Sequence, residues 1–250
     1  MSFVFPNFDF KEIPPAQEIL SGLVREGLVL FRNVPIDGNR AFLDLATSLG
    51  QLMRPPGILY SYDVEDEFVY LVTPACTGGE GPISQTDSEF EFHTDGFCLR
   101  ELPEIVLMLA LIPSKEGGIT SFVDVETVLP FLHQADVQSL TQKEYTFVSS
   151  GCRPILTRGE TGMMVAFNPY DLAGIKMNER SKTYSKEIEI ALRGDQAVHS
   201  FYSAVKKSPS RIDFRYNIGD CLVVNNRKML HSRTSFNGTR LLKRIWLKRD

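Results

Sequence analysis

The chain has 250 residues, of which 43% are hydrophobic and 23% are charged. This length and balance suit a globular protein with a sizeable core. No repeat or Gly/Ser/Pro-rich linker interrupts the chain, so we expect residues 1–250 to form a single domain. The formal net charge of -4 argues against a general nucleic-acid-binding or anionic-membrane surface.

The first residues and the cysteines predict a cytoplasmic location. The opening MSFVFPNFDFKEIPP lacks the basic start and continuous apolar core of a signal peptide. The longest uncharged apolar stretch, within EIVLMLALIPSK, is too short to span a bilayer. The cysteines form no CxxC pair and no disulfide framework, so we expect reduced thiols. The four cysteines are Cys76, Cys98, Cys152 and Cys221.

The first fifty residues predict a helix, a strand and a second helix. Apolar residues recur at helical spacing along one face of 16–27, and 28–34 is a short run of apolar and β-favouring residues. A second helical pattern covers 39–50, with Asn39 as its N-cap and Gly50 as its end.

Beyond about residue 68 the pattern changes to short strands separated by turn residues, interrupted by two helical segments at 124–135 and 195–207. Many short strands with few helices favour a closed or double-sheet β architecture over a parallel α/β sheet. The expected fold is therefore mainly β with flanking helices, and a jelly roll is the natural candidate. The predicted strands are 68–72, 90–93, 105–112, 145–149, 163–167, 220–225 and 240–248.

His93 and Asp95 are separated by one residue in the segment SEFEFHTDGF. Residues i and i+2 of a strand project to the same side, so the two side chains can converge on one ion. A third ligand from another strand would complete the 2-His-1-carboxylate arrangement of non-haem Fe(II) oxygenases. By itself the HxD motif is a weak signal, because it arises by chance in many proteins, and a hydrogen-bonded histidine at the end of a strand is the more common explanation of such a pair.

The C-terminal segment adds His231 and two arginines, Arg240 and Arg244. The arginines are four residues apart, so on a strand they share a face. An arginine can bind a carboxylate through two parallel hydrogen bonds. Together with a metal, such a clamp fits a dicarboxylate co-substrate. The alternative is that both arginines are solvated charges.

These segments together resemble the TauD/TfdA (taurine dioxygenase-like) family of Fe(II)- and 2-oxoglutarate-dependent oxygenases, which includes γ-butyrobetaine hydroxylase. FHTDGF resembles the family's HxD segment. GGITSFVD resembles its GG-x-T segment, and Thr120 follows His93 by twenty-seven residues. NNRKMLHSRTSF resembles the segment that holds the second histidine, and GTRLLKR resembles the arginine-bearing strand. Asn225 stands where many members have aspartate.

The resemblance implies a double-stranded β-helix of the clavaminate synthase-like type and a set of functional residues. It also implies an Fe(II)/2-oxoglutarate-dependent dioxygenase that uses O₂, hydroxylates a C–H bond of a small molecule and releases succinate and CO₂. The implied iron ligands are His93, Asp95 and His231. Thr120 and Arg240 would bind the distal carboxylate of 2-oxoglutarate, and Arg244 its proximal carboxylate or an acidic group of the substrate.

Other outcomes on the same scaffold stay open at this point. Desaturation and epoxidation use the same iron and co-substrate. Halogenases of this fold replace the carboxylate ligand with a small residue, and the presence of Asp95 disfavours that activity. The chain could also be an inactive jelly-roll binding protein, although such a protein would not need the full set of site residues.

The segment before His93 suggests a class of substrate. If the strand extends backwards, Glu91 and Glu89 lie on the same face as His93, and an acidic pocket favours a cationic guest. Together with Arg244, this suggests a zwitterion, either an amino acid or a similar small amine. The alternative is that residues 84–90 form a solvated loop. The sequence does not indicate an oligomeric state.

Overall fold

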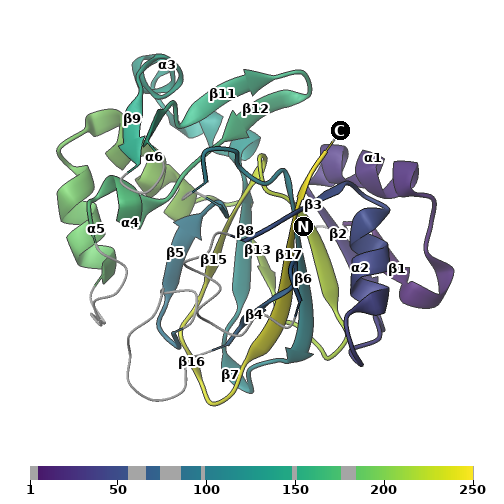
Figure 1. Cartoon of the computed structure of the whole chain (residues 1–250). Coiled ribbons are helices and arrows are strands. Elements are labelled where there is room, and N and C mark those ends of the chain that lie inside the picture. The colour runs from purple at the N-terminus through teal and green to yellow at the C-terminus, as the bar shows by residue number, and fades with distance from the viewer. Residues whose placement is uncertain are drawn as a thin grey trace.

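Two β-sheets face one another, and helices cover their outer surfaces (Figure 1). The structure is a computed structural model that describes residues 5–55, 66–73, 86–96, 99–147, 151–175 and 184–249. The larger sheet has the order β1-β2-β14-β6-β17-β3, with β4 also paired to β17, and the smaller sheet has the order β13-β8-β15-β5. This arrangement is a double-stranded β-helix, or jelly roll, as the sequence predicts.

The strands of the larger sheet are β1 (Asn7–Asp9), β2 (Leu28–Arg32), β3 (Gln51–Met53), β4 (Tyr70–Val72), β6 (Ile105–Ile112), β14 (Cys221–Asn225) and β17 (Leu241–Lys248). Those of the smaller sheet are β5 (Phe90–His93), β8 (Thr120–Asp124), β13 (Ile212–Phe214) and β15 (Met229–Arg233). Three short pairs are β7 (Glu116–Gly117) with β16 (Phe236–Asn237), β9 (Tyr145–Phe147) with β10 (Gly151–Arg153), and β11 (Leu156–Gly159) with β12 (Gly162–Val165). The α-helices are α1 (Ala16–Glu26), α2 (Arg40–Thr47), α3 (Gln134–Gln142), α4 (Pro169–Leu172), α5 (Tyr184–Leu192) and α6 (Gln196–Lys206).

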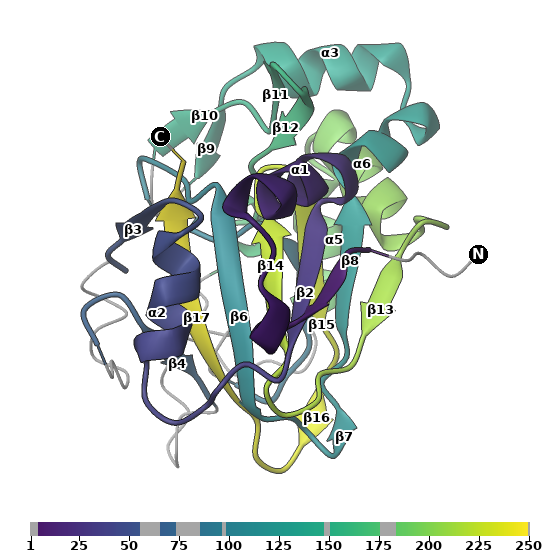
Figure 2. The same cartoon turned by 90° about the vertical axis from the view of Figure 1, so that its right-hand side faces the viewer.

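Strand β6 explains how the layers form, because its residues alternate between two cores. Val106 and Met108 point between the sheets, where they join Phe122 and Trp246. Leu107 and its neighbours on the other face pack beneath α1 and α2, which cover the larger sheet (Figure 2). A strand buried on both faces reads as one continuous apolar run rather than an alternating one.

The smaller sheet has a third core on its outer face. Phe92, Val123 and Leu230 of that sheet pack against residues of α3, α5 and α6, the helices grouped at the upper left of Figure 1. The space between the two sheets is therefore shielded by helices on both outer sides.

Local structure differs from the sequence prediction at two helices. The segment 124–135 forms two 3₁₀ turns, and α3 begins only at Gln134. Pro130 lies within this segment, and proline has no N–H for a helix interior. Asn39 precedes α2 but makes no side-chain capping bond, and the helix ends at Thr47, before Gly50.

The predicted strands at 90–93 and 105–112 are confirmed as β5 and β6. The strand β15, which carries His231, was not predicted. Cys152 and Cys221 are free thiols, and Cys76 and Cys98 lie outside the described residues. None of the helices in the described ranges is long and apolar enough to cross a membrane.

Candidate metal centre

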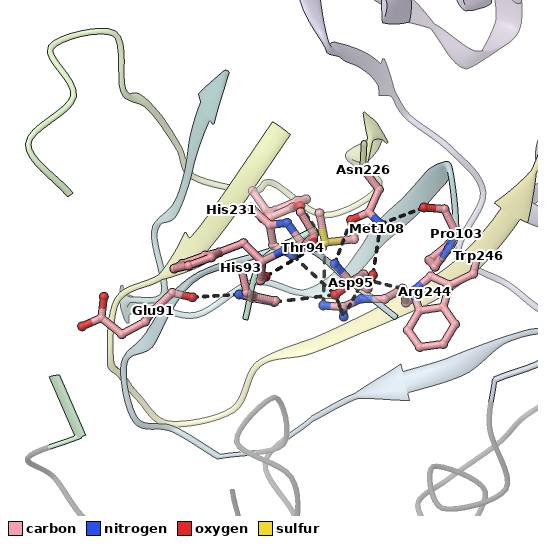
Figure 3. Close-up of polar contacts among 12 residues, drawn as sticks. Glu91, His93, Thr94, Asp95, Pro103, Met108, Asn226, His231, Arg244 and Trp246 are labelled. Atoms are coloured by element: carbon pink, nitrogen blue, oxygen red, sulfur yellow. Dashed lines mark hydrogen bonds and ion pairs between the residues drawn. The ribbon is translucent and has the colours of Figure 1, made fainter. Parts of the chain in front are cut away.

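Strands β5 and β15 bring the two predicted histidine ligands together. His93 and His231 are directly opposite each other in the antiparallel pair, and Asp95 follows β5 by two residues. The Nε2 atoms of His93 and His231 lie 3.6 and 3.5 Å from Oδ1 of Asp95 (Figure 3). Potential ligand atoms of the three residues lie within 4.8 Å of one another, and the side chains are buried. This geometry can hold one metal ion.

The histidine nitrogens also fit a metal. His93 donates a hydrogen bond from Nδ1 to the backbone oxygen of Glu91 at 2.8 Å, so its Nε2 carries a free lone pair. Neither the Nε2 of His93 nor that of His231 has a hydrogen-bond partner within the described part of the chain. Buried polar atoms are normally paired, and two such nitrogens beside a carboxylate suit a divalent ion such as Fe(II).

Protonation states at the cluster favour metal binding as well. Burial, reinforced by the neighbouring His231, lowers the pKa of His93 to about 4. Burial would raise the pKa of Asp95, but the charge of Arg244 and the adjacent imidazoles of His231 and His93 hold that pKa well below its usual range. His93 is therefore neutral and Asp95 ionised near pH 7, which are the forms that bind metals.

The backbone of the HTD segment is fixed by residues distant in sequence. The side chain of Thr94 accepts a hydrogen bond from the Phe167 N–H at 3.0 Å. The Asn226 side chain accepts from the Asp95 N–H at 2.8 Å and donates to the Asp95 carbonyl at 3.1 Å. Gly96 follows with φ +71°, and a Cβ there would lie 2.2 Å from Pro103. These contacts hold the ligands in place before any metal binds.

Strand β17 of the larger sheet holds the carboxylate itself. Nη1 of Arg244 lies 2.9 Å from both carboxylate oxygens of Asp95, and the indole Nε1 of Trp246 donates to Oδ2 at 3.0 Å. Arg244 was predicted to bind the proximal carboxylate of 2-oxoglutarate or an acidic group of the substrate, whereas in the structure its guanidinium pairs with the protein's own Asp95. Sequence reasoning did not identify Trp246 or Asn226. The i, i+2 spacing of Arg244 and Trp246 on one strand face is the signal that could have found Trp246.

Arg240 and Thr120 lie in the same interior without polar partners. Arg240 is 4% exposed, and its guanidinium lies 5.9 and 5.8 Å from the ring centroids of Tyr216 and Phe236. No described residue forms a hydrogen bond or ion pair with that guanidinium, and Thr120 Oγ1 also lacks a partner. Burial, with a contribution from Arg244, lowers the pKa of Arg240 to about 10. A buried cation without a counter-ion is costly, so this site suits an anionic guest.

A glycine turn sets the position of these two residues. Gly117 and Gly118 have φ angles of +69° and +62°, in the left-handed region that favours glycine. A Cβ on Gly118 would lie 2.1 Å from Ser114 Oγ and 3.4 Å from Arg240 Cδ. The missing side chain leaves room for the Arg240 stem next to the strand that begins with Thr120.

Positive charge accumulates in the interior. Arg233 is buried and donates to the backbone oxygens of Thr86 and Ser88 at 2.7 and 2.6 Å. Burial, together with the charges of Arg240 and Arg244, lowers the pKa of Arg233 to about 9. A metal cation would add further positive charge. The interior therefore favours a dianion over a neutral co-substrate.

The acidic residues before His93 are arranged differently from the prediction. The register shifts between the β15 pairs His231–His93 and Arg233–Phe90, and the Phe90 ring stacks on His93 at 3.8 Å between centroids. This irregularity breaks the simple alternation. Glu91 is buried and pairs with Lys206 at 2.9 Å, and its carboxylate points away from the metal ligands (Figure 3). The prediction that Glu91 faces the metal is therefore wrong. Glu89 precedes the strand and is exposed.

Comparisons with known proteins agree with this geometry. Trimethyllysine dioxygenase of Meyerozyma guilliermondii is 23% identical over 98% of the chain, which spans 62% of that relative's length. An asparagine oxygenase solved with Fe(II), 3-hydroxyasparagine and succinate superposes with a TM-score of 0.68 at 18% identity, over 95% of this chain and 81% of that one. The non-haem iron oxygenase OrfP, solved with Fe and α-ketoglutaric acid, gives 0.67 at 15% identity, over 96% and 82%. Residues 3–246 match the model of the taurine catabolism dioxygenase TauD, TfdA family, and the chain therefore belongs to that family.

Proposed function

We propose that the protein is an Fe(II)/2-oxoglutarate-dependent dioxygenase that hydroxylates a C–H bond of a small molecule and releases succinate and CO₂. The observation that carries this proposal is the pairing of two kinds of unsatisfied group in one interior. Two buried histidine nitrogens lack a hydrogen-bond partner and could bind a metal. The buried Arg240 and Thr120 also lack polar partners and could bind an anion. Iron, when bound, supplies the activation of O₂ that side chains cannot provide.

Each residue has a proposed role. His93, Asp95 and His231 hold the iron. Arg240 and Thr120 bind the distal carboxylate of 2-oxoglutarate, because a guanidinium and a hydroxyl together satisfy a carboxylate. Arg244 binds the proximal carboxylate of the co-substrate or an acidic group of the substrate, from its position beside Asp95. The protein contributes orientation and a fixed positive environment for a dianion.

The proposed substrate is an amino acid or a similar small amine. Two of the similar proteins are named for such molecules, trimethyllysine and asparagine. Glu89 is the better of the two predicted cation-binding residues, because Glu91 is already neutralised by Lys206. Arg244 pairs with Asp95 through Nη1, but its Nε has no hydrogen-bond partner among the described residues and would bind the acidic group of the same substrate.

We also propose a single-domain protein in the cytoplasm that binds neither nucleic acid nor membranes. The single domain is supported by the larger sheet, in which β17 lies between β6 and β3 and also pairs with β4. The cytoplasmic location is supported by the free thiols of Cys152 and Cys221.

The test is a screen for succinate. Protein loaded anaerobically with Fe(II) is mixed with 2-oxoglutarate, O₂ and a panel of amino acids and amines, and substrate-stimulated succinate is measured. Mass spectrometry of the product distinguishes hydroxylation, which adds one oxygen, from desaturation, which removes two hydrogens. The His231→Ala variant should be inactive. Iron and 2-oxoglutarate binding without any turnover across the panel would instead favour the binding-protein alternative.

A further inference from the structure

A cleft lined by arginines lies outside the interior that holds the candidate metal ligands. It is a cleft of about 650 Å³, within the size range of small-molecule sites. Its walls come from the connection between β5 and β6, from β10, from the β11–β12 hairpin and from the turn between β14 and β15. Three arginines, Arg100, Arg153 and Arg227, line it, and we call it the arginine cleft.

The guanidinium of one of these arginines is fixed in place, and the backbone of a second is anchored. Arg153 donates from Nη2 to the Leu99 carbonyl at 2.8 Å and lies over the Phe147 ring at 5.6 Å. Arg227 is held through its backbone, because its N–H donates to the Asn225 side chain at 3.1 Å and its carbonyl accepts from the Val165 N–H at 2.8 Å. A cation fixed in advance, such as Arg153, loses little freedom when it binds a ligand.

The described residues that line the cleft carry more positive than negative charge, three arginines against one glutamate. The guanidinium of Arg227 forms no hydrogen bond or ion pair with any described residue. Burial lowers its pKa, an effect that the charge of Glu104 opposes and that of Arg153 reinforces. Glu104 also lines the cleft, but its carboxylate pairs with Arg249 at 3.1 Å. Leu102, Met164 and Ala166 add apolar surface. The lining therefore combines excess positive charge with an apolar floor.

The arginine cleft is separate from the proposed co-substrate position. Arg240 lies directly before β17, and Arg249 lies directly after it. At the rise per residue of an extended strand, Arg240 and Arg249 are therefore roughly 30 Å apart. The cleft lies at the Arg249 end, beside Glu104. The cleft is adjacent to the candidate metal centre. Arg227 lines the cleft, and the neighbouring Asn226 accepts a hydrogen bond from the Asp95 N–H.

We propose that the arginine cleft is a binding site for an organic anion with two or more negative charges, either a phosphate ester or a polycarboxylate. Arginine guanidinium groups bind both kinds of oxyanion through paired hydrogen bonds, and the apolar floor accommodates the organic part of the ligand. This site goes beyond the proposed dioxygenase activity and does not depend on it.

Calorimetric titration of the metal-free full chain with inorganic phosphate, and separately with citrate, tests the proposal. One site per chain is expected, with tighter phosphate binding indicating a phosphate ester and tighter citrate binding a polycarboxylate. Arg227→Gln and Arg100→Gln should each weaken binding about tenfold. Arg240→Ala, in the proposed co-substrate site, and Arg158→Gln, an exposed arginine outside the lining, should keep the affinity within about twofold.

Three results would overturn the proposal. The first is the absence of binding of either anion up to roughly 10 mM. The second is wild-type affinity in both cleft variants; Arg100 is exposed, so its substitution leaves the fold intact even if Arg227→Gln does not fold. The third is loss of binding in Arg240→Ala, which would place the anion in the co-substrate site. None of these depends on turnover, so failure of the proposed activity is a separate result from the succinate screen.

Discussion

Two parts of the same interior differ in how their polar groups are satisfied. At the metal end, the carboxylate of Asp95 is held by Arg244 and Trp246 and its backbone by Asn226. At the co-substrate end, Arg240 and Thr120 have no polar partner among the described residues. The proposed metal ligands are therefore positioned by contacts within the protein, whereas the proposed co-substrate-binding groups are left for a ligand to satisfy. This difference predicts which substitutions weaken metal binding and which weaken 2-oxoglutarate binding.

The largest effect is expected for the histidine that β15 contributes. His231→Ala removes one of the three ligands, so Fe(II) binding should fall by about two orders of magnitude or more. Anaerobic equilibrium titration with Fe(II) measures this loss of affinity. His133→Ala, at the exposed N-cap of α3, is the matched control and should bind iron like the wild type. Retention of iron by His231→Ala would contradict the ligand assignment.

Arg240→Met should weaken 2-oxoglutarate binding without weakening Fe(II) binding. Loss of a charged carboxylate contact in a buried site costs a few kcal/mol, so the dissociation constant for 2-oxoglutarate should rise at least about tenfold while Fe(II) affinity is kept. The same substitution removes an unpaired buried charge, so the melting temperature of the ligand-free protein should stay equal or rise. Arg215→Met, at an exposed position, is the control. If Arg244→Ala weakens 2-oxoglutarate binding and Arg240→Met does not, the two roles are reversed.

Trp246→Phe should act at the metal end alone. It removes the hydrogen bond to Asp95 Oδ2, and loss of such an outer contact lowers metal affinity by about tenfold. Titration of Fe(II) in the absence of 2-oxoglutarate isolates this effect. Unchanged iron affinity would show that Arg244 alone is enough to hold the carboxylate.

Thr120→Val, which lies with Arg240 at the proposed co-substrate end, should give the smallest change in ligand affinity. The substitution keeps the shape of the buried side chain but removes one hydroxyl, a loss of about 1 kcal/mol or about fivefold in 2-oxoglutarate affinity. Iron affinity should not change. Because the hydroxyl has no partner without the co-substrate, the ligand-free protein should be no less stable. A clear drop in its melting temperature would show a structural role for the hydroxyl instead.

Sequence reasoning was strongest where a short pattern and its local structure coincide. The run at 105–112 became β6 because a strand buried on both faces needs continuous apolar residues. The HxD pair was placed correctly at the end of β5 because the motif needs only one strand. Pairing His231 with His93 depends on tertiary structure, and only the resemblance to a family supplied it.

Sequence reasoning failed where local irregularity decides the geometry. The face assigned to Glu91 assumed a regular strand, and the register shift opposite β15 overturns that assumption. Trp246 and Asn226 were missed because their partner, Asp95, lies 151 and 131 residues away in the chain. Spacing within one segment cannot reveal such contacts.

The separation along the chain between Asp95 and its partners has a consequence for biosynthesis. Arg244 lies 149 residues after Asp95, on a strand that is made late but sits between β6 and β3. A nascent polypeptide that has reached residue 225 already contains His93 and Asp95, yet it lacks the second histidine, the arginine and the indole. Because contacts so distant in sequence form slowly and synthesis proceeds from the N-terminus, a ribosome-bound chain of that length should not bind iron. We therefore expect metal to be loaded only after β17 has been synthesised.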